Sequence, residues 1–194
     1  MNEQRQVIVN KILEKQNLTL ALIRKQIFDI FDLSQTKFDA DNYYDQKRAL
    51  EYTSANEVSQ ERLSNNTALL AQIKKSDLVL DLGCGSGLSM LAAKRKNAFV
   101  IGFDLSSSML ELVDRKQNGD VIKLDLKQKL PFRDKIFDSA MSVGAIHFLQ
   151  EYESKLKQMF FEVNRVTEEN SPFAFQLFPS KKDQNQTLKL ETAS

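Results

Sequence analysis

An apolar segment that runs into three glycines at alternate positions restricts the fold of this chain more than any other feature. The segment Leu78–Leu82 is followed by Gly83, Gly85 and Gly87, and a helical pattern begins at Leu88. Glycine tolerates a positive φ and lets the backbone approach a ligand closely. Free N–H groups at the start of a helix face whatever lies beside them. The pattern predicts a strand, a ligand-binding turn and a helix, and therefore a site for a nucleotide-like cofactor.

The spacing of the glycines narrows the class of cofactor. A dinucleotide fingerprint would need its third glycine at Leu88 or Met90, and a P-loop would need Lys and Ser or Thr directly after Gly87. The remaining pattern, acid-x-Gly-x-Gly-x-Gly over Asp81–Gly87, resembles the first motif of class I S-adenosylmethionine (AdoMet) methyltransferases. A tight strand–helix corner that binds no ligand is the alternative interpretation of the glycines alone.

Two acids at predicted strand ends favour the cofactor. The apolar run Ala98–Phe103 ends in Asp104, and a carboxylate there can accept both hydroxyls of an unphosphorylated ribose. The resemblance to class I methyltransferases implies that Leu105 lies beside this acid. It also implies that Asp125, with Leu126, lies near the adenine amino group. A solvated acid at a strand end is the alternative for Asp125.

Composition bounds the protein class. The 194 residues suffice for one domain with a core, and 42% hydrophobic and 27% charged residues are ordinary for a globular protein. Cys84 is the only cysteine, so we expect no internal disulfide and no zinc cluster, and weakly expect an intracellular setting. No apolar run is long enough for a bilayer, and Met1–Gln6 does not resemble a secretory leader. The net charge of +1 argues against broad nucleic-acid affinity from charge alone.

The order of predicted elements indicates the fold class. Strands alternate with helices, which predicts an α/β, Rossmann-like, doubly wound and mostly parallel sheet, preceded by N-terminal helices. We expect helices over residues 5–33, 56–74, 88–95, 107–115 and 152–166, and strands over 78–82, 99–104, 121–126, 138–143 and 173–178. The expected divisions are an N-terminal helical extension (1–37), a methyltransferase domain (38–180) and a polar tail (181–194).

Five strands are fewer than the seven that class I methyltransferases normally have. The chain ends 16 residues after Phe178, and Leu188 with Leu190 could start one further strand but not two. The strand 173–178 is therefore expected to be an open, aromatic-rich edge unless something covers it. The helix 5–33 is expected to pack on the domain, with binding of a partner as the alternative.

Several segments together resemble the eukaryotic small-subunit ribosomal RNA guanine-N7 methyltransferase family, over about residues 38–183. They are Tyr52–Ser54, Leu80–Ser89, Gly102–Leu110, Ser142–Leu149 and Phe175–Pro179. The resemblance implies ribosomal RNA as the substrate and a role in ribosome biogenesis, in the nucleus and cytoplasm. It also implies a small zinc-binding activator protein as a heterodimer partner along the strand Val121–Leu126.

Methylation at this nitrogen needs little from the protein's side chains. N7 of guanine has a lone pair and no proton, so no general base and no catalytic residue are predicted. The candidates for the substrate pocket are His147, Phe148, Tyr44 and Phe178, of which the aromatic rings could stack on an extruded base. A histidine bonded locally at a helix start is the alternative for His147.

The chain also departs from this family. His147-Phe148 replaces a Gln-Trp pair, Glu51 and Glu57 stand where basic residues are usual, and Glu169–Pro172 replaces a Gly-Gly turn. These departures leave two alternatives open. One is a methyltransferase-like scaffold subunit that transfers no methyl group, and the other is a small-molecule methyltransferase.

Overall fold

The computed structural model describes residues 43–149 and 153–176. The predicted helix 5–33, the candidate Phe178 and the possible strand at Leu188 and Leu190 lie outside these residues. The described elements follow one another as α4 (Gln46–Leu70), β1 (Leu78–Leu82), α5 (Leu88–Lys94), β2 (Phe99–Asp104), α6 (Ser107–Leu110), α7 (Arg115–Asn118), β3 (Asp120–Lys123), β4 (Ser139–Val143), the 3-10 helix η1 (Ile146–Leu149), α8 (Glu153–Val166) and β5 (Phe173–Gln176).

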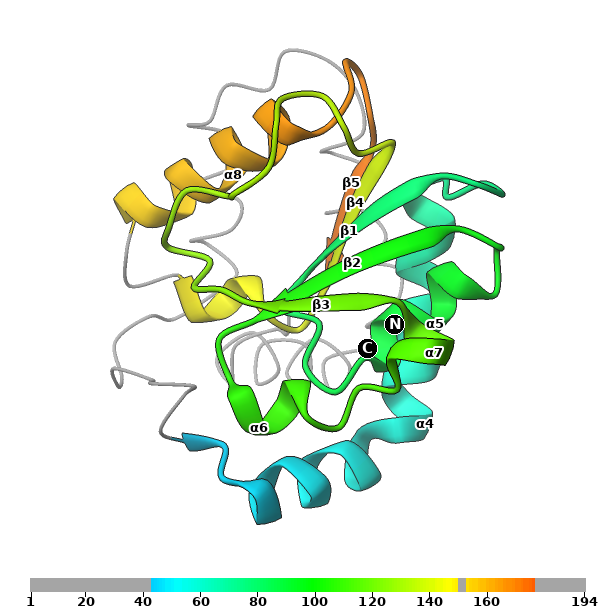
Figure 1. The fold of residues 1–194 in the computed structure, drawn as a ribbon, viewed down its shortest axis with the longest axis vertical. Helices are drawn as coiled ribbons and strands as arrows, with labels where there is room; N and C mark the ends of the chain where they lie inside the picture. Colours follow the sequence, from blue (N-terminus) through cyan, green and yellow to red (C-terminus); the bar gives the residue numbers. More distant parts are fainter. Residues whose placement is uncertain (1–42, 150–152, 177–194) are drawn as a thin grey trace, which may run out of the picture.

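The strands form one parallel sheet in the order β3-β2-β1-β4-β5 (Figure 1). The chain moves outward from β1 through β2 to β3, and then returns to β4 on the other side of β1. This reversal confirms the predicted doubly wound topology, and it leaves a crevice above the carboxyl ends of β1 and β4, where such sheets bind ligands. Within the described residues β5 pairs only with β4, as expected for an edge strand.

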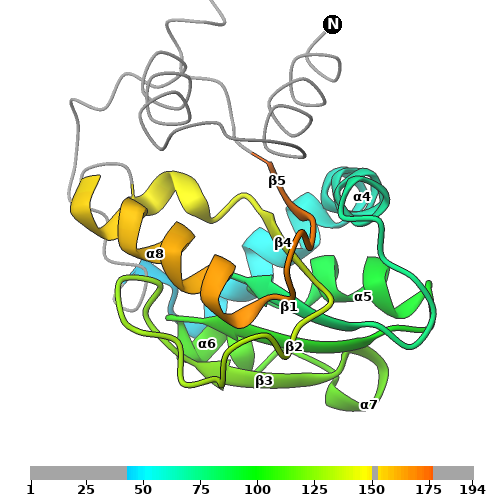
Figure 2. The same ribbon diagram turned by 90° about the horizontal axis from the view of Figure 1, so that it is seen from above.

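Each face of the sheet has its own apolar core, and Figure 2 shows the helices on the two sides. On one face, Leu156, Met159 and Val163 of α8 pack against the buried side chains of Phe103 and Phe175. On the other face, α4 and α5 cover a second cluster. Its buried members include Ala68, Ala93, Val79, Met141 and Ala174. Strands buried on both faces need the nearly continuous apolar runs that the sequence has at β1 and β2.

The helix before β1 differs from its predicted range, 56–74. α4 begins ten residues earlier because the carboxylate of Asp45 accepts a hydrogen bond of 2.8 Å from the backbone N–H of Arg48 and caps the helix. It ends at Leu70, and Gln72 then takes a positive φ of 52°, which turns the chain toward β1. The prediction missed the first ten residues since they lack an apolar period.

None of the helices in the described ranges is long and apolar enough to span a bilayer.

The segment predicted as one helix, 107–115, is two short helices. After α6, the N–H groups of Leu112 and Val113 bond to carbonyls three residues back, which tightens the chain and ends the helix. Asp114 then accepts from the N–H of Lys116 and caps α7. The strand predicted at 121–126 is also shorter, since β3 ends at Lys123 and Asp125 lies in the following loop.

Arg165 of α8 forms a buried ion pair within the helix and also attaches the helix to the loop after β3. Arg165 donates to the carbonyl oxygens of Leu130 and Phe132, both at 2.9 Å, and to the carboxylates of Glu162 (2.7 Å) and Asp134 (2.6 Å). Glu162, which is 4% exposed, also accepts from the N–H of Leu130. The hydrogen bond from Arg165 is the main reason that the pKa of Glu162 is lowered.

We predict that Arg165→Met lowers the free energy of unfolding by about 3 kcal/mol, because it leaves a buried carboxylate without its cation. The measurement is urea denaturation at pH 7. Since the pKa of Glu162 is lowered in the folded state, this stabilisation is present above the unfolded pKa and is lost as the pH falls through the folded one. The control is Glu61→Gln, which breaks the exposed 3.0 Å pair with Arg95 and should cost less than about 1 kcal/mol. Equal losses in the two variants would contradict the assignment.

Candidate functional site

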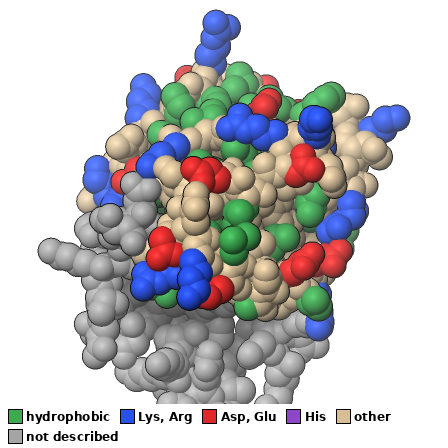
Figure 3. Space-filling view, turned by 60° about the horizontal axis from the view of Figure 1, so that its bottom comes forward, with side chains coloured by type: hydrophobic (Ala, Val, Ile, Leu, Met, Phe, Trp, Pro, Cys, Tyr) green, Lys and Arg blue, Asp and Glu red, His purple; other side chains and the backbone are tan. Residues whose placement is uncertain are grey.

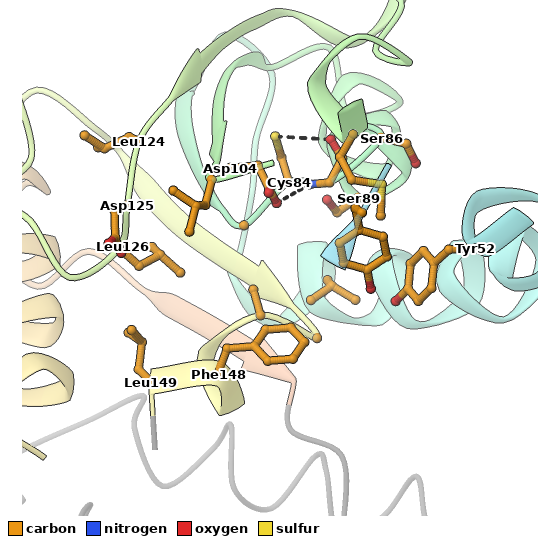
Figure 4. A pocket seen from close by; sticks show the side chains of 18 of the residues that line it. Tyr52, Cys84, Ser86, Ser89, Asp104, Leu124, Asp125, Leu126, Phe148 and Leu149 are labelled. Carbon is orange, nitrogen blue, oxygen red and sulfur yellow. Dashed lines mark hydrogen bonds between the residues drawn. The ribbon is translucent and has the colours of Figure 1, made fainter. Parts of the chain in front are cut away.

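An open pocket lies above the carboxyl ends of β1 to β4, with a volume of about 900 Å³ that includes space open to solvent. Figure 4 shows its residues from close by. Asp125 and Leu126 lie at one end, Tyr52 of α4 lies at the other, and Asp104 lies between them beside the glycine turn. The pocket thus joins the three regions that the sequence analysis treated as separate motifs.

Asp104 connects the end of β2 to the glycine turn after β1. One carboxylate oxygen accepts from the N–H of Gly85 and the other from the N–H of Ser106, each at 2.9 Å. Burial raises the pKa of Asp104, although the backbone hydrogen bonds from Ser106, Gly85 and Leu105 oppose that shift. Leu105 also lines the pocket. The carboxylate therefore fixes the turn and still faces the space where a ribose could lie.

The three glycines of the turn have different surroundings. All have a positive φ, but a Cβ on Gly83 would overlap Ala145, and one on Gly87 would overlap the side-chain amide of Asn118. A Cβ on Gly85 would meet nothing closer than Met109 at 4.0 Å, so it would project into open space. Gly83 and Gly85 line the pocket, whereas Gly87 caps α5 behind it. Gly85 is therefore the position where the missing side chain leaves room for a ligand.

Asp81, predicted as a cofactor-binding residue, lies beneath the pocket wall rather than in it. The side chain is fully buried, and its Oδ2 accepts a short hydrogen bond from the hydroxyl of Ser89, which does line the pocket. Among the described residues, Oδ1 has no hydrogen-bond partner. The pKa of Asp81 is raised to about 7. Burial is the largest cause; the hydrogen bond from Ser89 opposes the shift, and the charge of Asp104 adds to it.

The end of the pocket beside β3 contains the third predicted acid. Asp125 and Leu126 both line this end, as the resemblance implied. One oxygen of Asp125 accepts from the N–H of Lys127 at 2.9 Å, and the other lies 3.5 Å from the Lys127 ammonium. The side chain of Asp125 is 22% exposed, so it can still take a hydrogen bond from a ligand.

The opposite wall is aromatic and comes from three segments: Tyr44 precedes α4, Tyr52 belongs to α4 and Phe148 belongs to η1. The rings of Tyr44 and Tyr52 make an edge-to-face contact with ring centres 5.5 Å apart. Gln60 donates a hydrogen bond of 3.0 Å to the hydroxyl of Tyr52. Burial is the largest cause of the raised pKa of both tyrosines, so their phenols stay neutral at physiological pH. The sequence analysis identified Tyr44 and Phe148 but missed Tyr52 and Gln60 as pocket residues.

Tyr52 and Gln60 could have been recognised had the helix been predicted from Gln46. They are eight residues apart, and such positions share one face of a helix. Of the other expected residues, His147 lies in η1, next to the pocket residue Phe148. Glu51 and Glu57 are exposed and do not line the pocket. In the described residues there is no group of three His, Cys, Asp or Glu side chains that could bind a metal ion.

Comparison with known proteins agrees with this geometry. Residues 80–175 match the family described as "Methyltransferase domain". The fold is that of the class I methyltransferases. This family and fold support S-adenosyl-L-methionine as the cofactor, which confirms the prediction. A search of curated protein sequences finds no significant match.

Solved structures share the methyltransferase fold at low identity. A Methanococcus maripaludis protein described as an S-adenosyl-L-methionine-dependent methyltransferase is 17% identical, with a TM-score of 0.58 over 81% of this chain and 73% of that one. A Pyrococcus horikoshii protein is 25% identical, with a TM-score of 0.54 over 87% and 68%. A Haloferax volcanii protein, described as a methyltransferase and solved with the Trm112 methyltransferase activator, is 23% identical (TM-score 0.49, 63% and 55%). The match spans only 41% of an Anabaena variabilis methyltransferase from antibiotic biosynthesis.

We predict different effects for alanine at two glycines of the turn after β1. Gly85→Ala should weaken AdoMet binding while the free energy of unfolding falls by only about 1 kcal/mol, because the new methyl group projects into the ligand space at a positive φ. Gly87→Ala should lower stability by a larger amount, because its methyl group overlaps Asn118. Calorimetric titration and thermal unfolding measure the two quantities. A Gly85→Ala protein with unchanged AdoMet affinity would remove this glycine from the cofactor site.

We also predict a pH dependence that originates at Asp81. Because its folded pKa of about 7 lies above the ordinary value of 3.8 for an aspartate in the unfolded chain, the folded state binds more protons between these values, and stability decreases as the pH rises from about 4 to 7. Asp81→Asn should remove this slope and should be more stable than the parent at pH 8. Denaturation curves across this range test the prediction, with exposed Glu57→Gln as the control. An unchanged slope in the Asp81 variant would show that another group is responsible.

Proposed function

We propose that this protein is an AdoMet-dependent methyltransferase whose acceptor is N7 of a guanine in small-subunit ribosomal RNA. The observation that supports the proposal is that Asp104 and Gly85 line the same pocket as the aromatic wall. One half of the pocket has the groups that a nucleoside needs, and the other half has flat apolar surfaces. The finer assignment to the ribosomal RNA enzymes rests on the resemblance of the sequence segments.

The cofactor half has a hydrogen-bonding group for each polar part of a nucleoside. Asp104 would accept the ribose hydroxyls, Asp125 would accept the adenine amino group, and Leu105 with Leu126 would pack against the base. The backbone around Gly85 would lie against the amino-acid part, since no Cβ projects there. When bound, AdoMet supplies an electrophilic methyl group on a sulfonium.

The side chains around the pocket favour an acceptor that has no proton to lose. Tyr44 and Tyr52 stay neutral, so at physiological pH they are poor bases. Cys84 is buried, and its pKa is raised well above the ordinary value, so it is not a nucleophile. An acceptor such as guanine N7 needs only to be aligned with the methyl group. Alignment of this kind can contribute roughly 7–11 kcal/mol to lowering a barrier.

The aromatic wall would bind such an acceptor by stacking. The ring of Phe148 is 38% exposed and lines the pocket together with Tyr44. Stacking of a base on an aromatic side chain contributes about 1–3 kcal/mol. His147 and Phe178, the other predicted pocket residues, remain candidates for the same surface.

Binding of a long RNA would need help from a partner. On the face shown in Figure 3, basic side chains are interspersed with acidic and apolar ones, so this face has no continuous basic surface.

We propose that the small zinc-binding activator docks on the edge strand β3, within the predicted segment Val121–Leu126. Ile122 on this strand is 37% exposed. Nuclear and cytoplasmic localisation is part of the same proposal.

Two other functions remain alternatives. Glu51 and Glu57 replace the basic residues of the family, which favours a scaffold subunit without activity. The match to a general methyltransferase family over residues 80–175 is also compatible with a small-molecule acceptor. AdoMet binding and acceptor specificity separate these alternatives from the proposal.

The first test is AdoMet binding by calorimetry. We expect Asp104→Ala to weaken binding by about 10- to 100-fold, because hydrogen bonds to a charged group contribute about 1.5–3 kcal/mol. The matched control is Asp120→Asn, an exposed carboxyl at the opposite end of the neighbouring strand β3. Absence of AdoMet binding by the parent protein, with and without the activator, would leave the scaffold alternative.

The second test is transfer of a labelled methyl group to small ribosomal subunits and to a panel of metabolites. The proposal expects label in the ribosomal RNA, recovered as 7-methylguanosine after digestion. Label in a metabolite alone would favour the small-molecule alternative.

A further inference from the structure

The most unusual buried group outside the cofactor half of the pocket is the side-chain amide of Gln176. This residue ends β5 and is 3% exposed. Among the residues that the structure describes, neither its Nε2 nor its Oε1 has a hydrogen-bond partner. A buried polar group left unbonded destabilises the folded state, and such groups are rare in folded proteins. An unbonded amide, with a donor and an acceptor, therefore needs a physical explanation.

The position of Gln176 relates it to the pocket. It pairs in register with Val143 of β4, and Val143 lines the pocket. Paired residues of neighbouring strands point to the same face, and this face is the one that α4 covers, because Val143 and Ala174 both belong to the cluster beneath α4. The amide is thus one strand away from the pocket, on the side of its aromatic wall.

A second unbonded group lies on the facing helix. Ser64 of α4 is fully buried, and its hydroxyl has no partner among the described residues. Ser64 is one helical turn after the pocket residue Gln60 and shares its face of α4, which packs on β4 and β5. Gln60 and Ser64 therefore place two polar side chains one turn apart on α4, between the pocket and the apolar cluster.

We propose that Gln176 is a specificity-determining residue that binds the hydrogen-bonding edge of the acceptor. This inference rests on the proposed function. The amide offers a donor and an acceptor side by side, which matches a base edge with the same pair, such as O6 and N1–H of guanine. Gln176 does not line the pocket in the unliganded protein, so contact with the acceptor requires the amide to rotate about its side-chain bonds toward Val143. The free energy lost by the unbonded amide in the unliganded protein is recovered when the acceptor binds.

The test uses guanosine monophosphate as the probe, with the full-length protein saturated with S-adenosylhomocysteine. Gln176→Met keeps the length of the side chain and removes both polar atoms. We expect it to weaken binding of the nucleotide by about 5- to 150-fold, the range for a bidentate contact to a base. Its melting temperature should rise, because an unbonded buried amide is replaced by an apolar group. Gln176→Glu, which keeps an acceptor and loses the donor, should also weaken binding.

The matched control is Ser139→Ala. Ser139 is 1% exposed and its hydroxyl is also unbonded, but it begins β4, at the end of the strand away from the pocket. This variant should gain stability without a change in nucleotide affinity. Unchanged nucleotide affinity in Gln176→Met overturns the inference even if the parent protein methylates RNA. A parent protein that binds no guanosine monophosphate overturns it too, whereas loss of methyl transfer alone overturns only the proposed function.

Discussion

The hydrogen bond from the N–H of Gly85 to the carboxylate of Asp104 is the contact on which the rest of the site depends. It joins the turn after β1 to the end of β2, two neighbouring strands of the sheet. The N–H groups of Gly83 and Cys84 also bond to the carbonyl of Phe103, so the first part of the turn is attached to β2 as well. The same carboxylate faces the pocket. One side chain therefore both shapes the turn and remains available to a ligand.

Much of this arrangement could be predicted from the sequence, because the relevant signals are local. The run Leu78–Leu82 is apolar since β1 is buried on both faces, and the range predicted for β2 agrees with the structure. Alternation of strands and helices was sufficient to predict a parallel sheet, because parallel strands need crossover connections. Asp104 was identified from its position at a strand end, Gly83 and Gly85 from the spacing of the glycines, and Asp125 from the family resemblance, and all four line the pocket.

The features that were missed depend on contacts between distant segments. Asp81 and Gly87 belong to the motif, but packing against Ser89 and Asn118 places them behind the pocket wall. The start of α4 was predicted ten residues too late, and neither Tyr52 nor Gln60 was assigned to the pocket. The unbonded amide of Gln176 is invisible in sequence, because only the fold shows which buried groups lack a partner. Local patterns and the family resemblance thus identified pocket residues at the strand ends together with Tyr44 and Phe148, whereas Tyr52 and Gln60 needed the structure.

The length of α4 has a consequence for how the molecule responds to ligands. Tyr52 near its start and Gln60 beyond its midpoint line the pocket, and its last turn, at Thr67 and Ala68, is enclosed against the sheet. A continuous helix without glycine or proline joins the two regions. A bound molecule that orders the aromatic wall would therefore also reduce fraying of α4. Backbone amides in the buried last turn of the helix would then exchange their hydrogens more slowly. Ligand binding and the stability of the fold are in this way thermodynamically linked through α4.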